Sequence, residues 1–280
     1  GYLPAQFAHL QVKLDTIFQS ISERAPACRK VKHLYVCRMK HFGLIGKTLG
    51  HSFSSAFFKD YFEKNNIAAT YSNFELNDIA EIQSLFDQNL SGLNVTFPYK
   101  ESVIPFLDRL DDSAAQIGAV NVIAFENGEK VGYNTDAYGF AQSIKPFLTF
   151  EHERALIFGT GGASKAVAHV FKELGVEVFY ISRKADHQNR VYTYTEINDH
   201  MLKACKVLVN CTPIGTFPNV DASIELPFEF LTPAHLVIDL VYNPAQTALM
   251  KHAKTKGAAV MNGLSMLQHQ ALKSYEIWSR

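Results

Sequence analysis

The sequence predicts an α/β protein with two domains. A chain of 280 residues is long enough for two domains of ordinary size. Short apolar segments alternate with segments of helical periodicity, which is typical of parallel sheets covered by helices on both faces. One apolar segment, 154–158, runs directly into a glycine-rich turn and a helix, as the first strand of a doubly wound sheet does.

Composition excludes several classes of partner. Hydrophobic residues make up 47% and charged residues 19% of the chain, which suits a globular protein with real cores. Lys+Arg and Asp+Glu both total 27, so neither nucleic acid nor an anionic membrane surface is an expected partner. No apolar run reaches the length of a membrane span. The cysteines have no zinc spacing, so we expect reduced thiols, no metal site and a cytoplasmic location; they are Cys28, Cys37, Cys205 and Cys211.

The first series of elements mixes strands with helices. We expect strands at 41–46, 70–75, 91–97, 120–126 and 129–134. We expect helices at 52–65, 78–89 and 98–108. The dipeptide Asn127-Gly128 separates the last two strands and predicts a two-residue hairpin turn.

The second series has strands at 154–158, 176–182, 206–210, 236–241 and 258–261. Helices are expected at 135–147 and 162–174, and one more closes the chain. Apolar side chains line one side of this closing helix, so it packs on another element; they are Leu264, Leu267, Ala271, Tyr275 and Trp278.

Residues 1–38 are expected to be an N-terminal extension of unknown role. They lack the apolar core and cleavage site of a secretory signal. Apolar residues at helical spacing predict an amphipathic helix over 5–23; they are Phe7, Leu10, Leu14, Ile17, Phe18 and Ile21. No function is assigned to this segment.

The turn after 154–158 predicts dinucleotide binding. Gly159, Gly161 and Gly162 let the backbone turn tightly and approach a pyrophosphate, whose charge a helix N-terminus favours. The spacing is GxGGAS, and Ser164 stands where the third glycine of the full pattern would be.

The residues after the next strand indicate which dinucleotide binds. An NAD-binding domain usually carries an acid there for the ribose 2′-hydroxyl. This chain has Ser182, Arg183 and Lys184, and a guanidinium can hold a 2′-phosphate in a bidentate fork. The pattern favours NADP, and the alternative is an ordinary solvated loop arginine.

Five polar residues of the first series are candidates for chemistry, each with an ordinary alternative. Lys100 follows an apolar strand, as a reactive group or as a surface charge. Ser52 and Ser54 open a helix, as ligands or as capping residues. Asn121 interrupts an apolar run, where it binds a ligand or ties down a loop. Asp136 begins a helix, where an acid near the dipole is common.

The order of the motifs resembles the shikimate dehydrogenase family. In sequence they are HSFSS, NVTFPYK, GAVN, YNTD, GTGGAS, SRK, NCTPIG, DLVYNP and GLSMLQHQA, and the resemblance runs from about residue 41 to the C-terminus. It implies two α/β domains with a cleft between them. Residues 39–135 would form the N-terminal substrate-binding and catalytic domain, completed by helix 263–280, and residues 136–262 a Rossmann-type NADP-binding domain.

The resemblance also implies roles for individual residues. Lys100 and Asp136 would be the catalytic pair. The substrate would be bound by Ser52, Ser54, Thr96, Asn121, Tyr242 and Gln270. The cofactor NADP would be bound by Gly159, Thr160, Gly161, Gly162, Ala163, Ser182, Arg183, Lys184, Thr212 and Gly263. Ser265 and Asn262 depart from the family pattern beside the expected nicotinamide.

The implied activity is NADP-dependent reduction of 3-dehydroshikimate to shikimate, in chorismate and aromatic amino acid biosynthesis, by a monomer or homodimer. Three alternatives remain. Quinate/shikimate dehydrogenation with relaxed cofactor use has the same scaffold, but Ser54 and Arg183 argue against it. A methylenetetrahydrofolate dehydrogenase has a similar shape, but the paired serines do not suit folate. A non-catalytic homologue that senses the metabolite is disfavoured because Lys100 and Asp136 are both present.

Overall fold

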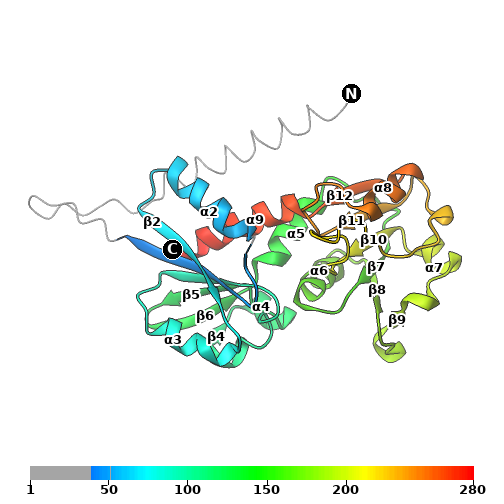
Figure 1. The fold of residues 1–280 in the computed structure, drawn as a ribbon. Coiled ribbons are helices and arrows are strands. Elements are labelled where there is room, and N and C mark those ends of the chain that lie inside the picture. Colours follow the sequence, from blue (N-terminus) through cyan, green and yellow to red (C-terminus); the bar gives the residue numbers. More distant parts are fainter. Residues whose placement is uncertain (1–38, 51) are drawn as a thin grey trace, which may run out of the picture.

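Two six-stranded sheets lie side by side along the molecule, joined by long helices (Figure 1). The structure is a computed structural model that describes residues 39–50 and 52–280. The α/β class is confirmed. The predicted extension 1–38 and its helix 5–23 lie outside the described residues, and the domain boundaries stay a prediction. None of the described helices is both long enough and apolar enough to span a bilayer.

The first sheet is mixed, so the expectation of a parallel sheet is wrong here. Its strands are β1 Lys40–Gly46, β2 Ala69–Glu75, β3 Gly92–Val95, β4 Arg109–Leu110, β5 Val122–Glu126 and β6 Glu129–Tyr133, in the order β2-β1-β3-β5-β6-β4. β1 is parallel to β2 and β3, whereas β5 is antiparallel to both β3 and β6. The antiparallel pairing of β5 with β6 follows from the predicted hairpin turn, in which Asn127 and Gly128 both have positive φ.

The helices of this half are α2 Phe53–Lys64, α3 Ile82–Phe86 and α4 Asp112–Ile117, with 3₁₀ turns at η1 Ile79–Glu81 and η2 Ile104–Phe106. The helix expected over 98–108 is wrong. Pro105 lies inside that range, and proline has no N–H to donate and restricts the residue before it, so only η2 forms. The sequence analysis missed α4, which begins at the cap Asp111 and ends at Gly118 in the left-handed region.

The second sheet is parallel throughout. Its strands are β7 Arg154–Phe158, β8 Glu177–Ser182, β9 Val191–Thr193, β10 Val207–Asn210, β11 Leu236–Asp239 and β12 Ala259–Asn262, in the order β12-β11-β10-β7-β8-β9. The order reverses at β7, and in such sheets ligands bind beyond the carboxyl ends of the strands at this point. The glycine turn after Phe158 therefore lies at the expected ligand position.

The α-helices of this half are α5 Thr135–Ile144, α6 Gly162–Glu173, α7 Asp199–Ala204 and α8 Ala248–Thr255, with 3₁₀ turns at η3 His187–Asn189, η4 Tyr194–Glu196 and η5 Phe228–Phe230. β4 in the first sheet, and β9, α7 and α8 here, were not expected from the sequence. The first two are short strands at sheet edges, with little periodicity to detect.

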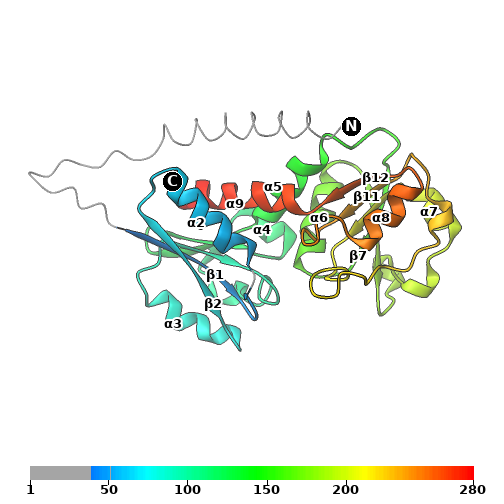
Figure 2. The same ribbon diagram turned by 45° about the horizontal axis from the view of Figure 1, so that its top comes forward.

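The closing helix α9, Leu264–Trp278, returns from β12 to the first sheet and runs beside α5 (Figure 2). Trp278 stacks on Phe42 with ring centroids 4.7 Å apart and donates its indole N–H to the carbonyl of Ile123 at 3.0 Å. Ala271 and Tyr275 belong to the same buried cluster. The partner of the predicted apolar face is thus the first sheet.

His235, just before β11, makes stability depend on pH. Its ring is buried, Nδ1 accepts from the N–H of Thr232 at 3.0 Å, and Nε2 lies 2.8 Å from the carbonyl of Leu202. Burial lowers the pKa of His235 below its ordinary value. The neutral ring therefore stabilises the fold fully above the unfolded pKa of about 6.5, and this contribution is lost as pH falls through the lower folded pKa.

We expect the free energy of unfolding to fall between pH 7.5 and pH 5.5 by more in the wild type than in His235→Gln, which has no proton to gain. Urea unfolding at both pH values measures this difference. The control His200→Gln changes an exposed imidazole and should behave as the wild type. A His235→Gln variant with the wild-type pH dependence would contradict the prediction.

Candidate active site

Lys100 and Asp136 form an ion pair between the two halves of the chain. Lys100 lies in the turn after β3, and Asp136 lies in the first turn of α5. The Lys100 Nζ is 2.5 Å from Asp136 Oδ2, and the two side chains are only 18% and 7% exposed. Lys100 is therefore not a solvated loop charge. A cation and a carboxylate this far from water must also satisfy their remaining hydrogen-bonding capacity.

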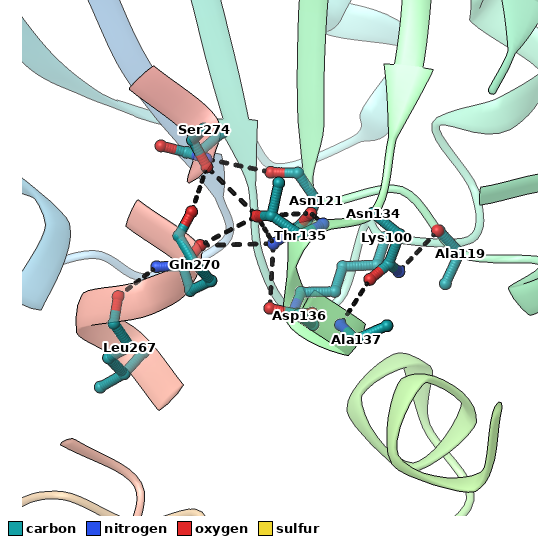
Figure 3. A network of polar contacts seen from close by, with 11 residues as sticks. Lys100, Ala119, Asn121, Asn134, Thr135, Asp136, Ala137, Leu267, Gln270 and Ser274 are labelled. Carbon is teal, nitrogen blue, oxygen red and sulfur yellow. Dashed lines mark hydrogen bonds and ion pairs between the residues drawn. The ribbon is translucent and has the colours of Figure 1, made fainter. Parts of the chain in front are cut away.

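Asn121 satisfies the second oxygen of the carboxylate. Its Nδ2 donates to Asp136 Oδ1 at 2.9 Å (Figure 3). Its Oδ1 accepts from the backbone N–H of Thr135 at 2.7 Å. Because a backbone N–H can only donate, the amide has one possible orientation, and its nitrogen must face Asp136. In this structure Asn121 orients the carboxylate, a role that the sequence analysis did not anticipate.

Residues of α9 complete the network from the far end of the sequence. Gln270 Oε1 accepts from Asn121 Nδ2 at 3.3 Å, and Ser274 Oγ lies 3.2 Å from Thr135 Oγ1. Figure 3 shows Gln270 and Ser274 of α9 meeting Thr135 and Asn121, and Asn121 in turn reaching Asp136. The expected residues Lys100, Asp136, Asn121 and Gln270 are thus brought together.

The network also contains four side chains that the sequence analysis missed: Asn94, Tyr71, Thr135 and Ser274. Asn94 Nδ2 donates to Ser274 Oγ at 3.1 Å and to the carbonyl of Asn121 at 3.2 Å, and its Oδ1 accepts from the Tyr71 hydroxyl at 2.7 Å. Asn94 interrupts an apolar strand as Asn121 does, so the same argument could have found it. Tyr71 and Ser274 carry no such signal.

The two expected serine ligands lie where α2 begins. Ser52 is the N-cap of α2, and its Oγ accepts from the N–H of Ser55 at 3.4 Å. Ser54 lies beside the Tyr71 hydroxyl, and burial raises the pKa of that phenol. Thr96 follows β3, and its N–H donates to the carbonyl of Ile45 at 2.8 Å. The Tyr71 hydroxyl donates to Asn94, so Ser54 lies beside the outer end of the network around Asn121.

Tyr242 approaches these residues from the second half of the chain. It follows β11, and its ring meets that of Phe53 edge-on with centroids 5.6 Å apart. Phe53 is the first residue of α2, between Ser52 and Ser54. Burial raises the pKa of Tyr242. The expected substrate residues Ser52, Ser54 and Tyr242 therefore lie where the start of α2 meets the loop after β11.

The glycine turn leaves the amino end of α6 open beside Lys100. Gly159 has φ of +101°, and Gly161 is the N-cap but supplies no side-chain hydrogen bond. The first backbone N–H groups of α6 are therefore available to an anion, as a pyrophosphate site requires. A Cβ on Gly162 would lie 3.2 Å from the Cβ of Lys100, so the turn packs closely on the catalytic candidate. The neighbouring positions Thr160 and Ala163 belong to the same turn.

The charge at the end of β8 suits a phosphate. Ser182 ends the strand, and Arg183 and Lys184 are exposed. Within the described part of the chain, neither cation has a carboxylate at ion-pair distance. Free cations beside an open helix end fit the phosphates of NADP. No cluster of three or more potential metal ligands occurs in 39–50 and 52–280.

Thr212 lies beside the glycine turn, whereas Gly263 packs against Leu240, the residue after β11. A Cβ on Gly159 would come within 3.2 Å of Thr212 Cγ2. A Cβ on Gly263 would lie 2.0 Å from the carbonyl oxygen of Leu240, so no other residue fits without moving the backbone. Asn262 and Ser265 both have structural partners, because Asn262 donates to the carbonyl of Ala245 at 2.9 Å and Ser265 contacts Ser143 at 3.2 Å.

A doubly wound domain with an open glycine turn, packed against a buried lysine–carboxylate pair, defines the class of dinucleotide-dependent dehydrogenases. Comparison with known proteins narrows the class. Residues 44–123 match the family pattern described as shikimate dehydrogenase substrate binding domain. The shikimate dehydrogenase (NADP(+)) of Desulforamulus reducens is 37% identical over 258 residues, which cover 85% of this chain and 89% of that protein.

Solved structures agree with this result. Shikimate 5-dehydrogenase from Thermus thermophilus, solved in complex with NADP(H) and shikimate, aligns with a TM-score of 0.75 and 29% identity, covering 86% of this chain and 93% of that one. Quinate dehydrogenase from Corynebacterium glutamicum in complex with NAD aligns with a TM-score of 0.75 and 26% identity, covering 85% of this chain and 93% of that one. The chain belongs to the shikimate dehydrogenase family.

The role of Asn121 in holding Asp136 leads to a stability prediction. Asn121→Ala leaves the N–H of Thr135 without its acceptor and Asp136 Oδ1 without its amide donor. Leaving buried polar groups unpaired should lower the free energy of unfolding by about 1–3 kcal/mol. Asn219→Ala, which removes an exposed amide, is the matched control for urea unfolding. Equal stability of the two variants would contradict the network.

Proposed function

We propose that this protein reduces 3-dehydroshikimate to shikimate with NADPH. The observation that carries the proposal is the Lys100–Asp136 pair, held beside the open amino end of α6. The residues of the glycine turn and Arg183 fit the phosphates of NADP, as described above. When bound, NADPH supplies the hydride for the reduction. We expect the protein to act in the cytoplasm as a monomer or homodimer.

The chemistry of the chain's own residues follows from charge. Reduction of a ketone develops negative charge on the carbonyl oxygen. The Lys100 ammonium donates a hydrogen bond to that oxygen and then gives it a proton, which Lys100 regains from water. Asp136 holds the ammonium in place with one oxygen, while Asn121 holds the other oxygen. The pair is thus oriented before the substrate arrives, which lowers the reorganisation that the reaction needs.

The substrate is oriented by polar groups on both sides of this pair. Ser52 and Ser54 donate to the substrate carboxylate, with Tyr242 beside them. Thr96, Asn121 and Gln270 bind the ring hydroxyls. The support for this assignment is placement, because Gln270 belongs to the same hydrogen-bonded network as Asp136, and Ser54 lies beside Tyr71 at the edge of that network. Binding of a substrate replaces hydrogen bonds that these side chains make with each other here.

Two arms of one assay separate this activity from the alternatives. NADPH consumption with 3-dehydroshikimate tests the proposal, and quinate with NAD tests the quinate-type activity. A metabolite sensor without catalytic activity would bind 3-dehydroshikimate and consume no cofactor. Turnover in the first arm, well above the second, is the expected result.

Lys100→Ala should lose about 10²–10⁴ in kcat, which is the usual cost of removing a general acid. Substrate affinity should change little, because the other polar contacts remain. The rate is measured by NADPH consumption, and Lys251→Ala, an exposed lysine on α8, is the control that should keep wild-type turnover. Turnover of Lys100→Ala within about threefold of the wild type would show that Lys100 is not the acid.

Arg183→Ala should reduce the preference for NADPH over NADH by about 10- to 150-fold, the value of one charge-assisted contact of about 1.5–3 kcal/mol. Lys184 retains part of the attraction, and NADH has no 2′-phosphate to lose. The measurement is kcat/KM for both cofactors at one ionic strength, because salt screens the contact. Arg190→Ala is the matched control, since that guanidinium is already paired with Glu177 at 2.8 Å. Equal weakening toward both cofactors in Arg183→Ala would contradict the assignment.

A further inference from the structure

Asp239 is a buried carboxylate that the proposed mechanism does not use. It ends β11 and is 0% exposed. Its oxygens accept from Thr247 Oγ1 at 2.6 Å, Asn210 Nδ2 at 2.8 Å and the N–H of Val241 at 3.1 Å. No lysine or arginine of the described residues forms an ion pair with it. A carboxylate with only neutral donors does not stabilise the fold by charge pairing, so its role is to hold those donors in place.

One of these donors, Asn210, is itself hydrogen-bonded to Thr212, so Asp239 fixes the orientation of the Asn210 amide and thereby the position of Thr212. Asn210 Nδ2 also donates to the carbonyl of Ile214 at 3.2 Å. Because Asp239 and the carbonyl of Ile214 both accept, the amide cannot be turned over, and Asn210 Oδ1 must face Thr212. That oxygen accepts from the N–H of Thr212 at 2.9 Å and from its Oγ1 at 2.6 Å. Both donors of Thr212 are therefore directed by Asn210.

Thr212 lies in the loop 211–216, which follows β10. The other two donors to Asp239, Val241 and Thr247, begin and end a separate loop, 241–247, which follows β11. Tyr242 of this loop contacts Phe53 of the first half. The N–H of Phe217 donates to the carbonyl of Asn243 at 3.2 Å, so the chain after 211–216 is tied to the same loop. Asp239 thus connects the loop 241–247 with the loop 211–216, whose Thr212 lies beside Gly159 of the glycine turn.

We propose that Asp239 and Asn210 are positioning residues for the nicotinamide end of the cofactor, acting through Thr212 and the loop 241–247. The inference rests on the proposed function, because it takes NADP as the ligand. The opposite end of the dinucleotide is held independently by α6 and Arg183. Changes at Asp239 or Asn210 should therefore weaken the binding of ligands that contain nicotinamide. They should leave the affinity for the phosphate-bearing adenosine half unchanged.

Direct binding of two ligands tests the proposal without an activity measurement. Isothermal titration with NADP⁺ and with 2′-phospho-ADP-ribose, which lacks nicotinamide, gives two dissociation constants for each variant. Asn210→Ala should weaken NADP⁺ by about tenfold, the effect of roughly one lost hydrogen bond, and change the fragment by less than about twofold. Equal weakening of both ligands, or of neither, would overturn the proposal. If the wild type bound neither ligand, the proposed function itself would fail.

Conservative replacement separates positioning from loss of structure. Asp239→Asn keeps an oxygen for Asn210 and Val241, and its new amide can donate to Thr247 Oγ1, so NADP⁺ binding should stay within about threefold of the wild type. A tenfold or larger loss in Asp239→Asn would overturn the hydrogen-bond role. Asp221→Asn, an exposed acid of the same half, is the control. If Asn210→Ala does not fold, Thr247→Val removes the donor at the other end. It should also weaken NADP⁺ more than the fragment, and an unchanged ratio would overturn the proposal.

Discussion

The largely buried ion pair between Lys100 and Asp136 is the interaction that the surrounding hydrogen bonds must satisfy. Two charges this far from water are stable only when every remaining lone pair and proton is satisfied. Asn121 supplies the missing donor to Asp136, and the orientation of its own amide is set by the backbone of α5. The junction between β6 and α5 therefore places the Asp136 carboxylate, and through the N–H of Thr135 it also orients the Asn121 amide.

That junction explains why α9 must return to the first sheet. Gln270 and Ser274 reach the network only because Trp278 and Tyr275 anchor the helix among the aromatic residues of β1 and α2. Burial of the apolar side chains at the end of α9 thus fixes the position of Gln270 and Ser274 in the network. Packing energy and the placement of polar site residues depend on the same helix.

The second half of the chain, around the glycine turn, is organised by other interactions than a buried ion pair. α6 offers open N–H groups and a partial positive charge, which attract phosphates without a specific side-chain geometry. The loops after β10 and β11 are instead shaped by hydrogen bonds that uncharged groups donate to Asp239. The two halves meet where Gly162 lies against Lys100, and a Cβ at this position would press on the lysine side chain. Glycine here lets the turn before α6 pack closely against the Lys100–Asp136 pair.

The sequence by itself determined the features that depend on a few neighbouring residues. The strand β7, the glycine turn, the start of α6 and the Asn127-Gly128 hairpin follow from local propensity and turn chemistry, and the ordered motifs identified the family. Local rules also gave wrong predictions. Apolar periodicity predicted a helix over 98–108 although Pro105 lies within it. Short elements such as β9 and α7 carry too little pattern to detect. The candidates Lys100, Asp136, Asn121 and Gln270 could be named from motifs. Their contacts could not, since Gln270 is separated from Asn121 by 149 positions.

Only the tertiary structure decided which contacts each of these polar residues makes. It joined Asn94, Tyr71 and Ser274 to the network, it directed the Asn121 amide toward Asp136, and it connected Asp239 to Thr212 through Asn210. The reason is that hydrogen bonds act over about 3 Å, and the partners in this site come from distant strands and helices. Their distances are set by sheet order and helix packing, which no local stretch of sequence contains.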